Sequence, residues 1–168
     1  MNAGAYGSEI KNVLVSCQYL DENLNIVKKE CKDLEFGYRD SFFIHNPNYI
    51  VLTAVFKLEL SMEEAVDIKM KENTLARKTK QPLEYPNAGS TFRRPEGYFV
   101  GKLIEDAGLR GYSIGDAEVS TKHTGFIVNK GNATCTDVKA LVKYIQEVVK
   151  EKFGVELKPE LEFIGKNI

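Results

Sequence analysis

The stretch GFIVNKGNATCTDVKALVKYIQEVVKEKFG, residues 125–154, changes its periodicity once and in doing so indicates the fold class. It begins with a short apolar run that is typical of a buried strand. After a turn, Thr134 is followed three residues later by Asp137, a pattern in which side chains satisfy the free amides at a helix start. Apolar residues then recur at helical spacing, and Gly154 is a typical residue for a helix end. We therefore predict a strand, a turn and a helix over 135–153.

The N-terminal part of the chain is predicted to form strands. Residues 11–16, 23–30 and 49–60 are rich in apolar and β-branched residues, and polar turn residues separate the first two segments. The segment 49–60, YIVLTAVFKLEL, carries the strongest strand signal in the chain. Polar residues alternate with apolar ones only at the end of this segment, so we expect most of the strand to be buried on both faces.

A helical period replaces the strand pattern in the next segment. Residues 61–80 carry apolar residues at an imperfect helical spacing, and basic residues gather at the end of the segment. Ser61 and Glu64 match a capping box, and Pro82 is expected to end the helix. A shorter helix is predicted over 98–108.

A last strand is predicted over 161–165, LEFIG. With it, the predicted elements place helices on one side of a mixed sheet. The sequence thus predicts an α+β fold, and it contains no repeat or low-complexity tract.

Composition narrows the possible classes of protein. The 168 residues are 43% hydrophobic and 28% charged, which is ordinary for a globular protein, and the net charge of −1 gives no basic character that would favour nucleic acid. The longest apolar run is far shorter than the roughly 18 residues of a membrane helix, so we expect no membrane span. The three cysteines are widely spaced and match neither a disulfide framework nor a zinc site. We therefore expect reduced thiols, no bound metal and a cytoplasmic protein.

The turn PNAGSTFRRP, residues 86–95, carries the most conspicuous polar groups. Ser90 could be a nucleophile, a general acid or a plain turn hydroxyl. Ser90 does not lie in a G-x-S-x-G motif and the two histidines follow no triad order, so acyl transfer at Ser90 is poorly supported. Arg93 and Arg94 on a stiff turn would suit a diphosphate, although a solvated basic surface is the simpler interpretation.

Three other segments are ambiguous when taken alone. The loop NAGAYG, residues 2–7, has glycines that could let backbone amides approach a ligand, or it could be an ordinary loop. In GYRDSFF, residues 37–43, Arg39 could clamp a carboxylate or phosphate, or form a surface salt bridge. Glu160 in KPELEFIG would usually be a solvated glutamate.

Taken together and in order, these segments resemble a known family. The motifs are NAGAYG, GYRDSFF, PNAGSTFRRPEGYFVGKLIEDAGLRG, GFIVNKGNAT and LKPELEFIG. They are similar to those of UDP-N-acetylenolpyruvoylglucosamine reductase, a flavoenzyme of bacterial peptidoglycan precursor synthesis. The short spacing before PNAGS resembles the subclass that lacks an extra loop over the substrate.

The resemblance implies a division into domains. Residues 1–60 would be the C-terminal portion of an FAD-binding domain, and residues 61–168 a substrate-binding domain whose last strand returns to the active site. In the family the NAGAYG motif follows a complete N-terminal lobe, so the resemblance implies that this lobe is missing. We accordingly expect weak or no FAD binding, no activity of the chain alone, and self-association through the sheet exposed in residues 1–60.

The resemblance also implies an activity and roles for individual residues. The family uses NADPH and FAD to reduce UDP-N-acetylglucosamine enolpyruvate to UDP-N-acetylmuramate. The implied catalytic residues are Ser90, which protonates a substrate carbanion, Arg39 and Glu160. The implied substrate-binding residues are Arg93, Arg94, His123, Lys80 and Gln81. The implied FAD-binding residues are Asn2, Ala3, Gly4, Ala5 and Gly7. Two alternatives remain open, a nucleotide-sugar binding module without redox activity and a non-catalytic anion-binding protein.

Overall fold

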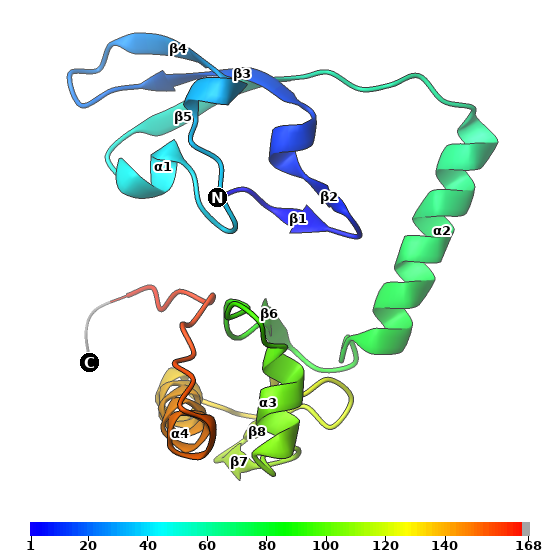
Figure 1. Cartoon of the computed structure of the whole chain (residues 1–168), viewed down its shortest axis with the longest axis vertical. Coiled ribbons are helices and arrows are strands. Elements are labelled where there is room, and N and C mark those ends of the chain that lie inside the picture. Colours follow the sequence, from blue (N-terminus) through cyan, green and yellow to red (C-terminus); the bar gives the residue numbers. More distant parts are fainter. Residues whose placement is uncertain (166–168) are drawn as a thin grey trace. The chain divides into compact units, whose positions relative to one another are not determined.

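The computed structural model describes residues 1–165, so the last three residues of the predicted domain 61–168 lie outside the described part (Figure 1). The chain divides into two compact units, Met1–Asn73 and Thr74–Ile168. The boundary falls within the long helix α2 (Glu63–Lys80). Helices and sheets occur together as predicted, and the α+β class is confirmed. The strand pairs are antiparallel throughout the described residues, so the expectation of a mixed sheet was wrong.

The first unit contains a short hairpin and a three-stranded sheet. The hairpin consists of β1 (Gly4–Ala5) and β2 (Ser8–Glu9), and the sheet has the order β4-β3-β5, formed by β4 (Ile26–Glu30), β3 (Leu14–Leu20) and β5 (Ile50–Phe56). Two short 3₁₀ helices, Ile10–Asn12 and Cys31–Asp33, and the single turn α1 (Phe42–His45) connect the strands. The Asp21 carboxylate accepts hydrogen bonds from the backbone amides of Asn23 and Asn25 and so closes the turn between β3 and β4.

The strand β5 is exposed along its whole length, which corrects the expectation of burial on both faces. It lies at the edge of the sheet, and within residues 1–165 its one partner strand is β3. The core of this unit is small, with Cys17, Tyr19 and Leu34 at its centre and several aromatic rings packed around them. Among the described residues of that core none comes from β5, so its apolar side chains have nothing to cover them.

The helix α2 forms where the sequence predicts it but begins two residues later. The carbonyl of Met62 accepts the first hydrogen bonds, from the amides of Ala65 and Val66. Met62 is therefore the N-cap residue of α2, and the prediction of a capping box at Ser61 was wrong. The helix ends at Lys80, before Pro82, as expected.

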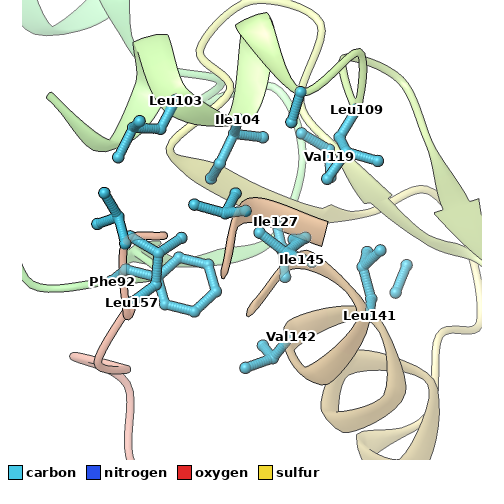
Figure 2. Close-up of a cluster of buried hydrophobic side chains, with 14 residues drawn as sticks. Phe92, Leu103, Ile104, Leu109, Val119, Ile127, Leu141, Val142, Ile145 and Leu157 are labelled. Atoms are coloured by element: carbon cyan, nitrogen blue, oxygen red, sulfur yellow. The ribbon is translucent and has the colours of Figure 1, made fainter. Parts of the chain in front are cut away.

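The second unit packs two helices against a four-stranded sheet. The strand order is β6-β9-β8-β7, formed by β6 (Asn87–Ser90), β9 (Phe126–Asn129), β8 (Ala117–Val119) and β7 (Ser113–Ile114). The helices are α3 (Val100–Asp106) and α4 (Cys135–Phe153). Figure 2 shows apolar side chains of α3, α4, β8 and β9 meeting at a common core. None of the helices in residues 1–165 is both long enough and apolar enough to cross a membrane.

The helix α4 confirms the prediction made from its sequence pattern. The Asp137 amide donates to Thr134 Oγ1 at 3.1 Å and the Thr134 amide donates to Asp137 Oδ2 at 2.8 Å, which is a complete capping box. Gly154 ends the helix with a φ of 68°, a left-handed conformation that glycine adopts readily.

Replacing Leu141 by alanine is expected to destabilise the second unit by about 2–5 kcal/mol, because the side chain is completely buried and its loss leaves a cavity. Urea unfolding followed by circular dichroism measures the change. Lys143→Ala on the exposed side of the same helix is the control, since its ion pair with Glu147 is a surface pair worth about 0.3–0.5 kcal/mol. Equal losses in the two variants would contradict this assignment of the core.

The C-terminal segment differs from its prediction, because 161–165 is not a strand. A single antiparallel bridge joins Pro159 to Phe92. Proline has no amide hydrogen, so the segment cannot donate a ladder hydrogen bond at that position. Beyond Glu160 the described chain continues to residue 165 without strand pairing.

Candidate functional site

The turn that carries Ser90 is held by the side chain of Asn87. The Asn87 amide group donates to the carbonyls of Pro82 and Tyr85 at 3.1 and 2.9 Å, and its oxygen accepts from the Gly89 amide at 3.0 Å. Gly89 has a φ of +82°, which residues with a Cβ rarely adopt. The turn therefore presents Ser90 in an exposed position at the end of β6.

Glu160 is joined through the backbone to the residue next to Ser90. Its amide donates to the Thr91 carbonyl at 2.9 Å, and the Arg93 amide donates to the Lys158 carbonyl at 2.8 Å. Thr91 is buried, and its hydroxyl accepts a hydrogen bond from the Ile127 amide of β9 at 3.1 Å. Two of the predicted catalytic residues thus lie on neighbouring stretches of backbone, anchored to the sheet by Thr91.

The two arginines of the same turn have different surroundings. Arg93 is half-buried, whereas Arg94 is exposed. Arg94 Nε donates to the Tyr98 carbonyl at 3.2 Å, and its guanidinium carbon lies 4.0 Å from the centre of the Phe99 ring. The guanidinium is therefore oriented by a hydrogen bond and by a cation–π contact.

The remaining predicted substrate-binding residues also lie in the second unit. His123 precedes β9 and its Nδ1 accepts from the Gly125 amide at 3.1 Å, so in the neutral ring Nε2 carries the hydrogen and can donate. Lys80 is the exposed last residue of α2. Gln81 follows it, and its amide extends the last turn of the helix by donating to Arg77.

The first unit brings Arg39 and the glycine loop to one cavity of about 360 Å³. Its lining includes Gly4, Ala5 and Gly7 of the loop, and the cations Lys11 and Arg39. Glycine is needed at position 4 because a Cβ there would come within 2.8 Å of the Glu9 side chain. Backbone amides next to two cations are the donor set that binds phosphate-bearing groups, so these residues could hold part of a nucleotide cofactor such as FAD.

Asn2 is only 1% exposed, and its side chain is hydrogen-bonded to residues of two other segments. Its Nδ2 donates to Glu9 Oε2 at 2.6 Å and to the Gly37 carbonyl at 3.1 Å, while its Oδ1 accepts from the Lys11 amide at 3.1 Å. The hydrogen bonds of Lys11 and of Asn2 to the Glu9 carboxylate hold the pKa of Glu9 below its ordinary value. Glu9 is therefore ionised beside the cations of the cavity at neutral pH.

The chain is similar to known proteins along most of its length. A family model of the C-terminal domain of UDP-N-acetylenolpyruvoylglucosamine reductase matches residues 81–164. The chain belongs to this reductase family. Reductases of this name from Caldanaerobacter subterraneus subsp. tengcongensis and Clostridium tetani are 57% and 51% identical to it, over 98% and 99% of the chain. The crystal structure of the reductase from Thermus caldophilus superimposes with a TM-score of 0.80 at 34% identity, over 95% of this chain and 57% of that one.

The chain spans about half the length of the curated reductases that it matches, 54% for both the Caldanaerobacter and the Clostridium tetani proteins. The motifs did not identify Asn87 and Thr91 as residues that shape the site, and they assigned Asn2 to FAD binding without indicating the contacts of its side chain. An asparagine two residues before a glycine is a turn signal and could have identified Asn87. The other two act across long sequence separations, and no local pattern reports such contacts.

Proposed function

We propose that this chain carries the substrate site and part of the FAD site of an NADPH-dependent UDP-N-acetylenolpyruvoylglucosamine reductase. The reaction is the reduction of UDP-N-acetylglucosamine enolpyruvate to UDP-N-acetylmuramate, a step of peptidoglycan precursor synthesis. Membership of the family supports this proposal. The observation that carries it is the hydrogen bond from Glu160 to Thr91, because it brings Glu160 beside the turn of Ser90.

Ser90 is the proposed proton donor. FAD, once reduced by NADPH, would supply a hydride to the vinyl carbon distal to the ether oxygen. The neighbouring carbon, which bears the substrate carboxylate, then becomes a carbanion that must take up a proton. A serine hydroxyl is a weak acid, but it can donate to so basic a carbon when it is held within hydrogen-bonding distance. The exposed position of Ser90 at the end of β6 leaves it accessible to a substrate.

Arg39 and Glu160 are proposed to act on the substrate carboxylate. Charge from the carbanion spreads onto that carboxylate, so a cation directed at it is most useful in the transition state. The planar guanidinium of Arg39 can bind both carboxylate oxygens at once. Glu160 would share a proton with the same group, because two ionised carboxylates side by side repel each other.

The residues proposed to bind the UDP-sugar and those proposed to bind FAD lie in different parts of the chain. Arg93, Arg94, His123, Lys80 and Gln81 are proposed to contact the UDP-sugar, which presents a diphosphate to cations and donors. The loop of Asn2, Ala3, Gly4, Ala5 and Gly7 is proposed to contact FAD through its backbone, because its glycines line the cavity of Arg39.

A hybrid enzyme tests the proposal. Residues 1–168 replace the matching part of the Caldanaerobacter reductase, to which they are 57% identical. The hybrid is expected to oxidise NADPH over repeated turnovers only when the enolpyruvyl UDP-sugar is present. Binding of the UDP-sugar in calorimetry without NADPH oxidation would instead favour a nucleotide-sugar binding module, and the absence of both would overturn the proposal.

The exposed strand β5 is proposed to mediate self-association of the chain. It combines an unpaired sheet edge with exposed apolar side chains such as Leu52, which is 45% exposed. Sedimentation velocity is expected to show a dimer or larger species, and Leu52→Lys is expected to shift the population to monomer. Leu24→Lys in the β3–β4 turn is the control and should leave the assembly intact. A monomeric wild-type chain with a folded first unit would refute this proposal.

A further inference from the structure

The backbone of Arg39 adopts a conformation that its own turn only weakly enforces. Its φ of +53° lies in the left-handed region, which is unfavourable for a residue with a Cβ and persists where the surroundings impose it. The turn is closed by two backbone hydrogen bonds, from Gly37 to Asp40 at 3.2 Å and from Asp40 to Gly37 at 3.4 Å. The second is at the long end of the range for such bonds. A further constraint on the turn is therefore expected from outside it.

Asn2 supplies such a constraint at the first residue of the turn. Its Nδ2 donates to the Gly37 carbonyl at 3.1 Å, across 35 positions of sequence. The same nitrogen donates to Glu9 at 2.6 Å, and Oδ1 accepts from the Lys11 amide. Only this orientation of the side-chain amide is consistent, because a flipped amide would set its oxygen against two acceptors and its nitrogen against a donor.

The amide of Asn2 thus joins three segments that surround the cavity of Arg39. Glu9, Lys11 and Arg39 line that cavity, and Asn2 is buried. A buried amide whose two hydrogens and one oxygen lone pair are all used fixes its partners, because each lost bond would leave a polar group unsatisfied.

We propose that Asn2 is a positioning residue, which holds the Gly37–Asp40 turn so that Arg39 points its guanidinium into the cavity. The proposal rests on the proposed function, in which Arg39 binds the substrate carboxylate. It gives the side chain of Asn2 a role through Arg39 and Glu9, in addition to the backbone contact with FAD that is proposed for its loop.

Backbone order parameters from ¹⁵N relaxation of the 168-residue chain test this role without flavin or substrate. In the wild-type chain the amides of Tyr38, Arg39 and Asp40 are expected to be rigid, with values near 0.85. In Asn2→Ala these values are expected to fall below about 0.6, while those of β3 stay unchanged. A rigid turn in the variant would overturn the proposal. An equal loss of order in β3 would do so too, since Asn2 would then stabilise the whole unit.

Two further variants separate positioning from packing. Asn2→Asp keeps the shape and the acceptor for Lys11 but loses both donated hydrogen bonds, so it is expected to free the turn as much as Asn2→Ala does. Asn23→Ala, an exposed asparagine in the β3–β4 turn, is the matched control and should leave the Arg39 turn rigid. If Asn2→Asp behaves like the wild-type chain, the donated bonds do not hold the turn and the proposal is wrong. The proposed function and the role of Asn2 can fail separately. If the turn is loosened in Asn2→Ala but the hybrid enzyme that retains Asn2 is inactive, the proposed function fails. The role of Asn2 in positioning Arg39 then stands.

Discussion

Replacing Ser90 by alanine is expected to lower the turnover of the hybrid enzyme about 10²–10⁴-fold, the usual contribution of a positioned proton donor. The change removes one hydroxyl from an exposed turn whose geometry depends on Asn87 and Gly89, so the turn should persist. Calorimetry should therefore find the affinity for the UDP-sugar nearly unchanged. The loss should appear in kcat and not in substrate binding, because the proton is needed only after hydride transfer.

The matched control for Ser90→Ala is Ser113→Ala. Ser113 is an exposed serine on β7, outside every role proposed above, and its replacement should leave turnover unchanged. A second control is the reduction of bound flavin by NADPH alone, which does not involve Ser90 and should keep its rate. Turnover of Ser90→Ala at the wild-type rate would remove Ser90 from the mechanism.

Replacing Arg39 by lysine is expected to lower kcat/KM about 10²–10³-fold, as for the loss of a preorganised donor at a developing charge. Lysine keeps the charge but cannot offer two parallel hydrogen bonds to a carboxylate. The backbone cost of the left-handed conformation is similar for the two residues, since both carry a Cβ. Steady-state kinetics of the hybrid enzyme with varied enolpyruvyl UDP-sugar measure the effect.

Arg110→Lys is the control for Arg39→Lys. Arg110 is an exposed arginine that pairs with Glu105 and bonds the Thr121 carbonyl in the second unit, and no substrate role is proposed for it. Its replacement should leave kcat/KM unchanged. If Arg39→Lys also retains full activity, the bidentate contact of Arg39 with the carboxylate is excluded.

Local patterns predicted the helices well, because the forces that begin and end a helix act over a few residues. Thr134, Asp137 and Gly154 define α4 through contacts within one turn of the helix. The capping box predicted at Ser61 is the exception. Met62, the next residue, occupies the N-cap position of α2 that the pattern assigned to Ser61. Burial of β5 could not be predicted from its composition, because burial depends on which elements cover a strand and not on the strand alone.

The candidate site was only partly predictable from the sequence. The motifs identified Ser90, Arg39 and Glu160 one by one. Their surroundings depend on contacts between distant segments, such as the bond from Glu160 to Thr91 and that from Asn2 to Gly37. Asn2 illustrates the limit, because its motif places it in a glycine loop while its side chain is used to join three segments.

The central claim is that these residues complete a reduction in which hydride and proton arrive at different carbons. Product analysis by NMR after turnover of the hybrid enzyme in D₂O with unlabelled NADPH tests it most directly. Deuterium is expected on the carbon that bears the carboxylate in the lactyl group of the product. The methyl group would gain deuterium only as far as the nitrogen-bound hydrogen of reduced FAD exchanges with solvent before its transfer. Hydrogen in place of deuterium on the carbon that bears the carboxylate, or NADPH oxidation without a reduced sugar product, would contradict this mechanism.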